Sequence, residues 1–177
     1  MRQMLKNKLK EQKGLTLIEL LAVIVILGII AAVAVPSVLN IIDNSKKDAH
    51  VANAKQMISA AKLAVAEIDN LRPAKPASGT AVRYVNLKFL EDNGYLDTIK
   101  DPESSSAYTA TNDAKVATTN SVAGFSAAPT ADGDCYVMIT VDTNGKQTFA
   151  VSLVGSKKSI GATTPVDESA LGRNSVN

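Results

Sequence analysis

The first long run of apolar residues lies close to the N-terminus. Residues 15–35 read LTLIELLAVIVILGIIAAVAV, and these 21 residues hold one charged side chain, Glu19. As an α-helix the run would be about 31 Å long, close to the ~30 Å thickness of a bilayer's hydrocarbon core. Helices of soluble proteins rarely stay apolar on every face over such a length, so the pattern predicts a membrane-spanning helix.

After Pro36 the pattern becomes amphipathic. Between Ser37 and Asn70 apolar residues recur every three or four positions, which is the period of one helix face. We therefore expect one helix from Leu15 to Asn70, whose second half packs against a sheet. His50 lies in a part of this helix that we expect to be exposed, so a solvated histidine is predicted rather than a ligand. The residues of the apolar stripe are Ala54, Met57, Ile58, Ala61, Val65, Ile68 and Leu71.

Between this helix and residue 134 the signals are shorter. Two prolines in residues 71–76 end the helix, and Val85–Asn93 predicts a short helix capped by Gly94, with Tyr95 and Leu96 packing back. Residues 101–134 are rich in Ser, Thr, Ala, Asn and Gly, which is typical of a surface loop. We place one or two short strands in it, such as Ala107–Thr111 and Ser121–Ala127.

The clearest strands come next. Cys135–Val141 and Gln147–Val154 are β-prone, and the segment between them contains Asn144-Gly145, a strong hairpin signal. The polar tail, residues 156–177, is expected to supply a last strand or to wrap the sheet edge. The fold class is thus α+β: a long N-terminal helix, membrane-spanning and then amphipathic, on a small antiparallel sheet.

Charge separates the first residues from the rest. The first 14 residues carry five basic side chains and one acidic one, a formal charge of +4, although the whole chain carries only +2. By the positive-inside rule this basic segment stays in the cytoplasm, and the chain after Pro36 lies outside. The small net charge does not indicate a nucleic-acid binder.

A secretory signal peptide also has a basic segment and an apolar core. Ala32-Val33-Ala34 resembles a cleavage site for ordinary signal peptidase, which would leave a secreted globular binding protein. Two residues disfavour this interpretation. Glu19 lies inside the apolar core, where a charge costs about 2.5–3.5 kcal/mol on insertion scales. Pro36 follows just after the cut, where proline suits cleavage poorly.

The residues around Gly14 carry a resemblance to a known family. Lys13-Gly14-Leu15-Thr16-Leu17-Ile18-Glu19, followed by the apolar run, is similar to the class III signal of type IV pilins and their relatives. The specific match covers about residues 13–40. In that family the first residue after the cut is usually phenylalanine, and here it is Leu15.

The resemblance implies a role for each matched residue. Residues 1–14 would be a leader removed by prepilin peptidase after Gly14, and the new α-amine of Leu15 would be N-methylated. Glu19 would pair with the Leu15 amine of a neighbouring subunit during assembly, since an amine and a carboxylate in apolar surroundings each need an opposite charge. The helix would lose regular turns between Gly28 and Pro36 when packed into a filament.

The resemblance also implies an organisation and a cell location. Residues 15–36 would form the transmembrane and filament-core helix, and residues 37–177 a pilin head. The head would comprise the helix half 37–70, a helix-loop region 71–134, the hairpin 135–154 and a tail 155–177. The precursor would be a single-pass membrane protein and the product an extracellular filament.

Little in the chain points to catalysis. The chain has one histidine and one cysteine, and no nucleophile has a visible paired base. It also has no phosphate-binding glycine loop and no zinc-ligand spacing. We therefore expect no enzyme and no cofactor. Asp132-Gly133-Asp134 lacks the further oxygen ligands of a calcium loop and is interpreted as a polar turn. Cys135 is expected to be a small buried hydrophobe. With one cysteine there is no C-terminal disulfide loop, which favours a Gram-positive-type pilin.

The function that the resemblance implies is assembly. The chain would be the structural subunit of a type IV pilus, a helical homo-oligomer built by prepilin peptidase, a membrane platform and an assembly ATPase. Such a filament would serve adhesion, aggregation or biofilm formation, and surface motility. A pseudopilin of a type II secretion or DNA-uptake system is the alternative, because it would share residues 13–40.

Overall fold

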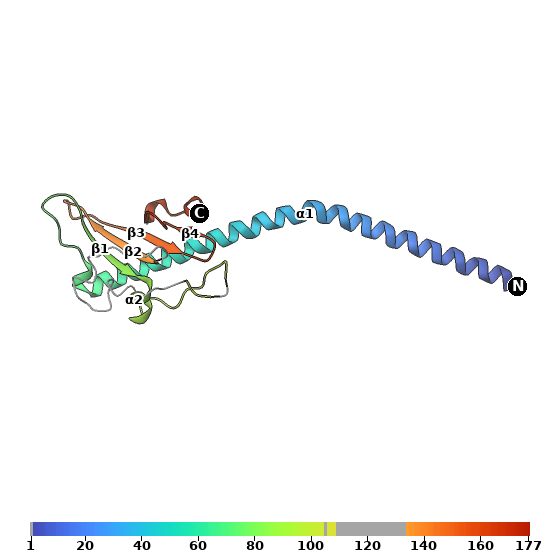
Figure 1. Cartoon of the computed structure of the whole chain (residues 1–177), viewed down its shortest axis with the longest axis horizontal. Coiled ribbons are helices and arrows are strands. Elements are labelled where there is room, and N and C mark those ends of the chain that lie inside the picture. Colours follow the sequence, from blue (N-terminus) through green and yellow to red (C-terminus); the bar gives the residue numbers. More distant parts are fainter. Residues whose placement is uncertain (1, 105, 109–133) are drawn as a thin grey trace. The chain divides into compact units, whose positions relative to one another are not determined.

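The computed structural model describes residues 2–104, 106–108 and 134–177, and within these ranges it describes side chains from Leu17 onward. The chain divides into two compact units, residues 1–43 and residues 44–177 (Figure 1). Helix α1, Arg2–Glu67, runs through both and continues without interruption past Gly28 and Pro36.

The predicted long helix is confirmed, but both of its ends differ from the predicted Leu15 and Asn70, because the helix already begins at Arg2. The helix stops at Glu67 because Ile68 adopts an extended backbone, and a short 3-10 turn, η1 over Asp69–Leu71, follows. The two prolines of residues 71–76 then lead the chain away in extended and bend conformations. The prolines therefore act a few residues beyond the true helix end.

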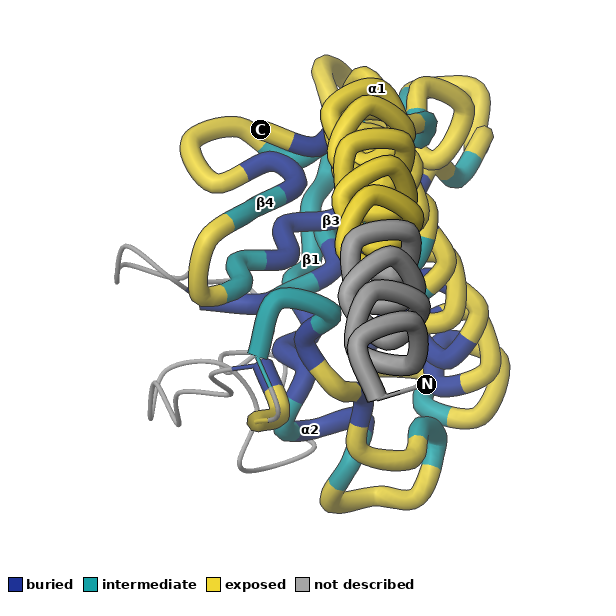
Figure 2. The backbone as a smooth tube through the Cα atoms, turned by 90° about the vertical axis from the view of Figure 1, so that its right-hand side faces the viewer, coloured by how far each residue is buried: buried dark blue, intermediate teal, exposed yellow. Residues whose placement is uncertain are grey.

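The second unit is held together by the stripe on α1. Ala54, Met57, Ile58, Ala61 and Val65 are buried, as predicted. Figure 2 shows the exposed first part of α1 in yellow and the buried stretches of the second unit in dark blue. Each large apolar side chain buried here contributes about 1.5–3 kcal/mol relative to exposure in water.

The sheet that receives the stripe is antiparallel throughout. Its strands are β1 (Ala81–Asn86), β2 (Tyr136–Val141), β3 (Gln147–Val154), β4 (Ser159–Ile160) and β5 (Val166–Asp167). The order is β1-β2-β3-β4, and β5 also pairs with β3. Burial alternates along β2, whereas β1 buries its last two residues and β3 buries Phe149–Leu153. Val85, Val137 and Val151 are fully buried and belong to the other half of the core.

The hairpin predicted around Asn144-Gly145 is confirmed. β2 and β3 pair from Tyr136↔Ser152 to Val141↔Gln147. The Asp142 carboxylate accepts hydrogen bonds from the backbone N–H groups of Asn144 (2.9 Å) and Lys146 (2.8 Å). Gly145 has φ of +85°, a conformation that favours glycine, so the turn depends on this residue.

The prediction of a helix over Val85–Asn93 is wrong in its first two residues. Val85 and Asn86 end strand β1, and helix α2 covers Leu87–Asp92. Pairing with β2 keeps Asn86 extended, and its Oδ1 accepts a hydrogen bond from the N–H of Phe89 at 2.8 Å. Asn86 is therefore the helix cap. Gly94, with φ of +74°, ends the helix as predicted.

The tail closes the sheet without a disulfide. β4 and β5 extend it as the sequence predicted, and Ser159 and Asn177 exchange two backbone hydrogen bonds of 2.9 Å each. Cys135 is buried, as expected, and its Sγ accepts a hydrogen bond from the N–H of Val154 at 3.3 Å. Burial raises the pKa of this thiol to about 11, so it stays protonated and inert.

The prediction for His50 is wrong. Its side chain is fully buried, at 0% exposure, and contacts Tyr108. The reason is that the 99–108 segment, for which the sequence indicated no partner, packs over this turn of α1. The strand expected at 121–127, most of the one expected at 107–111, and Asp132-Gly133 lie outside the described residues.

Candidate assembly segment

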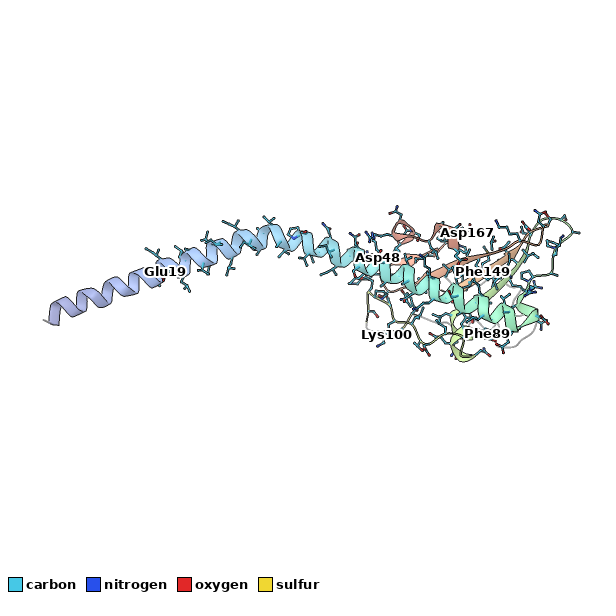
Figure 3. The ribbon with its side chains drawn as sticks, turned by 180° about the vertical axis from the view of Figure 1, so that it is seen from behind. Glu19, Asp48, Phe89, Lys100, Phe149 and Asp167 are labelled. Carbon is cyan, nitrogen blue, oxygen red and sulfur yellow. The ribbon has the colours of Figure 1, made fainter. Side chains whose placement is uncertain are left out.

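The N-terminal unit exposes an unusual amount of apolar surface. Every large hydrophobic side chain described between Leu17 and Ile42 is exposed, from 46% for Ile42 to 75% for Val33. Figure 3 shows these side chains projecting on both sides of the ribbon. A soluble monomer rarely leaves so large a patch in water, so lipid or other protein chains must cover it.

This segment is also the one described helix that is long and apolar enough to cross a membrane, with a mean hydropathy of 3.0 in its most apolar window. A signal sequence near an N-terminus passes the same test. Length and composition therefore agree with membrane insertion. The residues at the start of the helix must distinguish a permanent membrane-spanning helix from a cleaved signal sequence.

Glu19 is the one charged side chain between Leu17 and Ile42 (Figure 3). It is exposed, and none of the side chains that the structure describes forms an ion pair with it. Leu15 precedes it by four residues, about 6 Å along the helix axis. In an apolar environment the carboxylate would need a cation from outside the described part of its own chain.

Gly14 and Leu15 lie within the helical backbone of α1, where the structure describes no side chain before Leu17. Glycine is about 1 kcal/mol less favourable than alanine in a helix, so the turn around Gly14 is easier to open than its neighbours. A peptidase that needs an extended substrate would find it there.

Gly28 and Pro36 both lie in regular helix. A Cβ added to Gly28 would meet nothing within 4 Å, so packing inside the described chain gives no reason for glycine at this position. Pro36 removes one helical backbone hydrogen bond. Both residues weaken the helix, and both are exposed.

Comparison with family models supplies the deciding observation. A model described as the prokaryotic N-terminal methylation motif matches residues 9–35. The chain carries the class III signal of type IV pilins. The match includes Gly14, Leu15, Glu19 and Gly28 and ends one residue before Pro36. The long helix on a small antiparallel sheet is the type IV pilin fold. Comparison of the chain with curated proteins and with solved structures gave no match.

The signal and the fold together support a pilin-like or pseudopilin precursor and favour a structural rather than an enzymatic role. The motif implies processing by prepilin peptidase. In the described ranges no three His, Cys, Asp or Glu side chains are grouped so as to hold a metal ion. What the sequence analysis missed is the buried cluster around His50. Extending the apolar stripe back by four residues from Ala54 reaches His50 and would have predicted its burial.

The division of the chain into residues 1–43 and 44–177 can be tested on the second unit alone. Deleting residues 1–43 removes every exposed large hydrophobic side chain among the described residues except Leu63. We expect the fragment 44–177 to be soluble and monomeric by light scattering after gel filtration, with helical circular dichroism. The matched fragment 15–177 should require detergent. Aggregation of the 44–177 fragment would show that the stripe on α1 does not find its partner within the head.

Proposed function

We propose that the chain is a prepilin and that its mature form is the structural subunit of a type IV pilus. The observation that carries this proposal is the exposed apolar helix that begins with the methylation motif. In the precursor, lipid covers the helix. In the filament, the same surface packs against helices of other subunits.

Processing separates these two states. Prepilin peptidase cuts after Gly14 and removes the leader with its +4 charge, which holds the N-terminus at the cytoplasmic face. The cut creates an α-amine on Leu15, which is then methylated and stays a cation. The precursor lacks this amine and cannot make the pairing that follows.

Glu19 sets the register of assembly. Moving an apolar helix from lipid to protein gains little from the hydrophobic effect, because lipid tails are as apolar as leucine. Helix packing and charge pairing must then supply the free energy that draws the subunit from the membrane into the filament. The Glu19 carboxylate pairs with the Leu15 amine of an adjacent subunit. This pairing fixes the distance along the filament axis between successive subunits. Gly28 and Pro36 let the helix open locally to fit the bundle.

The partners and the location follow from this mechanism. A membrane platform and an assembly ATPase extract the subunits, and the product is an extracellular homo-oligomer. The head residues 37–177 then lie on the filament surface and mediate adhesion, aggregation and surface motility.

Immunoelectron microscopy with an antibody to the head tests the proposal. We expect filaments that label along their whole length in wild-type cells and that are missing from a deletion strain. A deletion strain with unchanged filaments and a loss of protein secretion or DNA uptake would assign the chain to the pseudopilins instead.

A further inference from the structure

The second unit contains a buried polar cluster that the assembly function does not use. His50 of α1 is fully buried, and Tyr108 and Asp101 from the 99–108 segment are almost so. Tyr108 Oη lies 2.6 Å from His50 Nδ1, and His50 Nε2 lies 3.7 Å from Asp101 Oδ1. A histidine and a carboxylate without solvent are costly unless each is fully bonded.

The hydrogen bonds define the proton positions. Asn53 Nδ2 donates to the backbone oxygen of Lys100 (3.0 Å) and to Tyr108 Oη (3.3 Å). Burial raises the pKa of Tyr108, so its hydroxyl keeps its proton, and because Asn53 already donates to Tyr108 Oη we assign Tyr108 as the donor to His50 Nδ1. The imidazole proton therefore sits on Nε2, which faces Asp101 but has no hydrogen-bond acceptor within range among the described atoms.

Asp101 joins the 99–108 segment to a second one, the turn between β3 and β4. Its Oδ1 accepts from the N–H of Glu103 at 2.9 Å, and its Oδ2 accepts from the N–H of Ser156 at 2.7 Å. The fit is tight: a Cβ on Gly155 would lie 3.1 Å from His50 Cε1 and 3.1 Å from Asp101 Oδ2. Three segments that are distant in the sequence thus meet at one imidazole.

The charges around the cluster come from every element that packs against it. Asp101 and Glu103 face His50 from the 99–108 segment, and Lys158 faces it from the β3–β4 turn. From α1 itself, Lys46 pairs with Glu103 at 3.1 Å. Cys135, the thiol near Tyr108, stays neutral because burial raises its pKa.

We propose that protonation of His50 is an acid switch that releases the 99–108 segment and the β3–β4 turn from α1. Once protonated, Nδ1 becomes a donor and can no longer accept the Tyr108 proton, and a cation is left without solvent. The carboxylate of Asp101 offsets this only in part, because its Oδ1 lies 3.7 Å from His50 Nε2, beyond hydrogen-bond distance. Release gives the imidazolium access to water.

The direction of the pH effect follows from the two states. Burial lowers the pKa of His50, and the attraction of Asp101 and Glu103 does not restore it. The released state has the ordinary value of about 6.5, so it binds more protons as the pH falls. Above about pH 6.5 protonation does not weaken the contact. Below that pH the equilibrium constant between the closed and released states falls by up to tenfold per pH unit, until the pH reaches the lowered pKa of His50 in the closed state.

The pKa of Asp101 belongs to a separate, more acidic range. Burial acts to raise this pKa, but the hydrogen bonds from Ser156 and Glu103 outweigh burial and hold it below its usual range. Its contribution is present above about pH 3.9 and is lost only as the pH falls further. Glu91, whose pKa is raised by burial, is hydrogen-bonded to the backbone of Ile99, so the His50→Asn variant is needed to assign a transition between pH 6.5 and pH 5 to His50.

Since the chain has one histidine, NMR can follow it without assignment. Full-length protein with ¹⁵N-labelled histidine, in detergent micelles, should show the Nε2–H tautomer at pH 7.5 and a titration midpoint below 6.5. A midpoint at or above 6.5, or the Nδ1–H tautomer, would overturn the proposal.

Hydrogen exchange measures the release itself. Between pH 7 and pH 5, protection corrected for intrinsic exchange should fall at least fivefold in peptides covering 99–108 and 155–158, and should stay constant in the β2–β3 hairpin. In His50→Asn, whose amide can still accept from Tyr108 but does not titrate, protection should not change with pH. Constant or rising protection of the two segments in the wild type would contradict an acid-released contact, whether or not the variant folds.

Discussion

Replacement of Glu19 with alanine should nearly abolish filament assembly while membrane insertion and leader cleavage continue. Alanine removes an intramembrane charge that costs about 2.5–3.5 kcal/mol on insertion scales, so the precursor should insert at least as well as the wild type. Assembly loses its pairing with the Leu15 amine. Leaving one partner of a buried ion pair alone costs about 3–5 kcal/mol, so sheared-filament yield should fall by about tenfold or more.

Conservative variants separate charge from shape at this position. Glu19→Gln keeps the shape and loses the charge, and it should assemble as poorly as Glu19→Ala. Glu19→Asp keeps the charge on a side chain one methylene shorter and should give an intermediate yield. Precursor cleavage and filament yield are measured side by side in each strain. Wild-type pilus levels in Glu19→Ala cells would mean that Glu19 merely reaches toward the membrane interface.

Replacement of Gly14 with a bulky residue such as tryptophan should leave uncut precursor in the membrane. A large side chain next to the scissile bond would not fit where the peptidase accepts glycine, and the leader would keep its +4 charge at the cytoplasmic face. Without cleavage there is no Leu15 amine, so filaments should be absent as well. Immunoblotting of membrane fractions would show the longer precursor in place of the mature subunit.

A matched control lies one residue away. Leu15→Phe introduces the residue that most relatives carry after the cut, and it should be processed and assembled normally. Mature-sized protein from the Gly14→Trp strain would place the processing site elsewhere.

The parts of the fold that the sequence predicted are those with strong local signals. The apolar run around Gly28 is too long for a soluble helix. Asn144-Gly145 is a strong hairpin signal, and the two strands lie within one residue of their predicted bounds, at Tyr136–Val141 and Gln147–Val154. The stripe on α1 was readable because a helix face repeats every three to four residues.

The errors arose where tertiary contacts overrode local pattern. Ala81–Asn86 is a short edge strand followed at once by a helix, so its last two residues, Val85 and Asn86, were predicted to be helical. The burial of His50 depends on Tyr108 and Asp101, which are more than fifty residues away in the chain. A polar residue on an otherwise apolar helix face should be interpreted as buried and bonded before it is interpreted as solvated.

The residues proposed for processing and assembly differ from His50, because the sequence alone indicates them. Gly14, Leu15 and Glu19 form a motif that is contiguous in the sequence, because a peptidase and a neighbouring subunit both bind the start of one helix. A single subunit contains neither partner. The sequence therefore indicates these residues more directly than the structure of one chain does.

The N-terminus of the mature protein tests the central claim most directly. Sequencing or intact-mass analysis of protein sheared from cells should give a chain that begins at Leu15, with a methyl group on its α-amine. A chain that begins at Val35 would instead show removal of the whole apolar helix by ordinary signal peptidase, and it would contradict assembly through that helix.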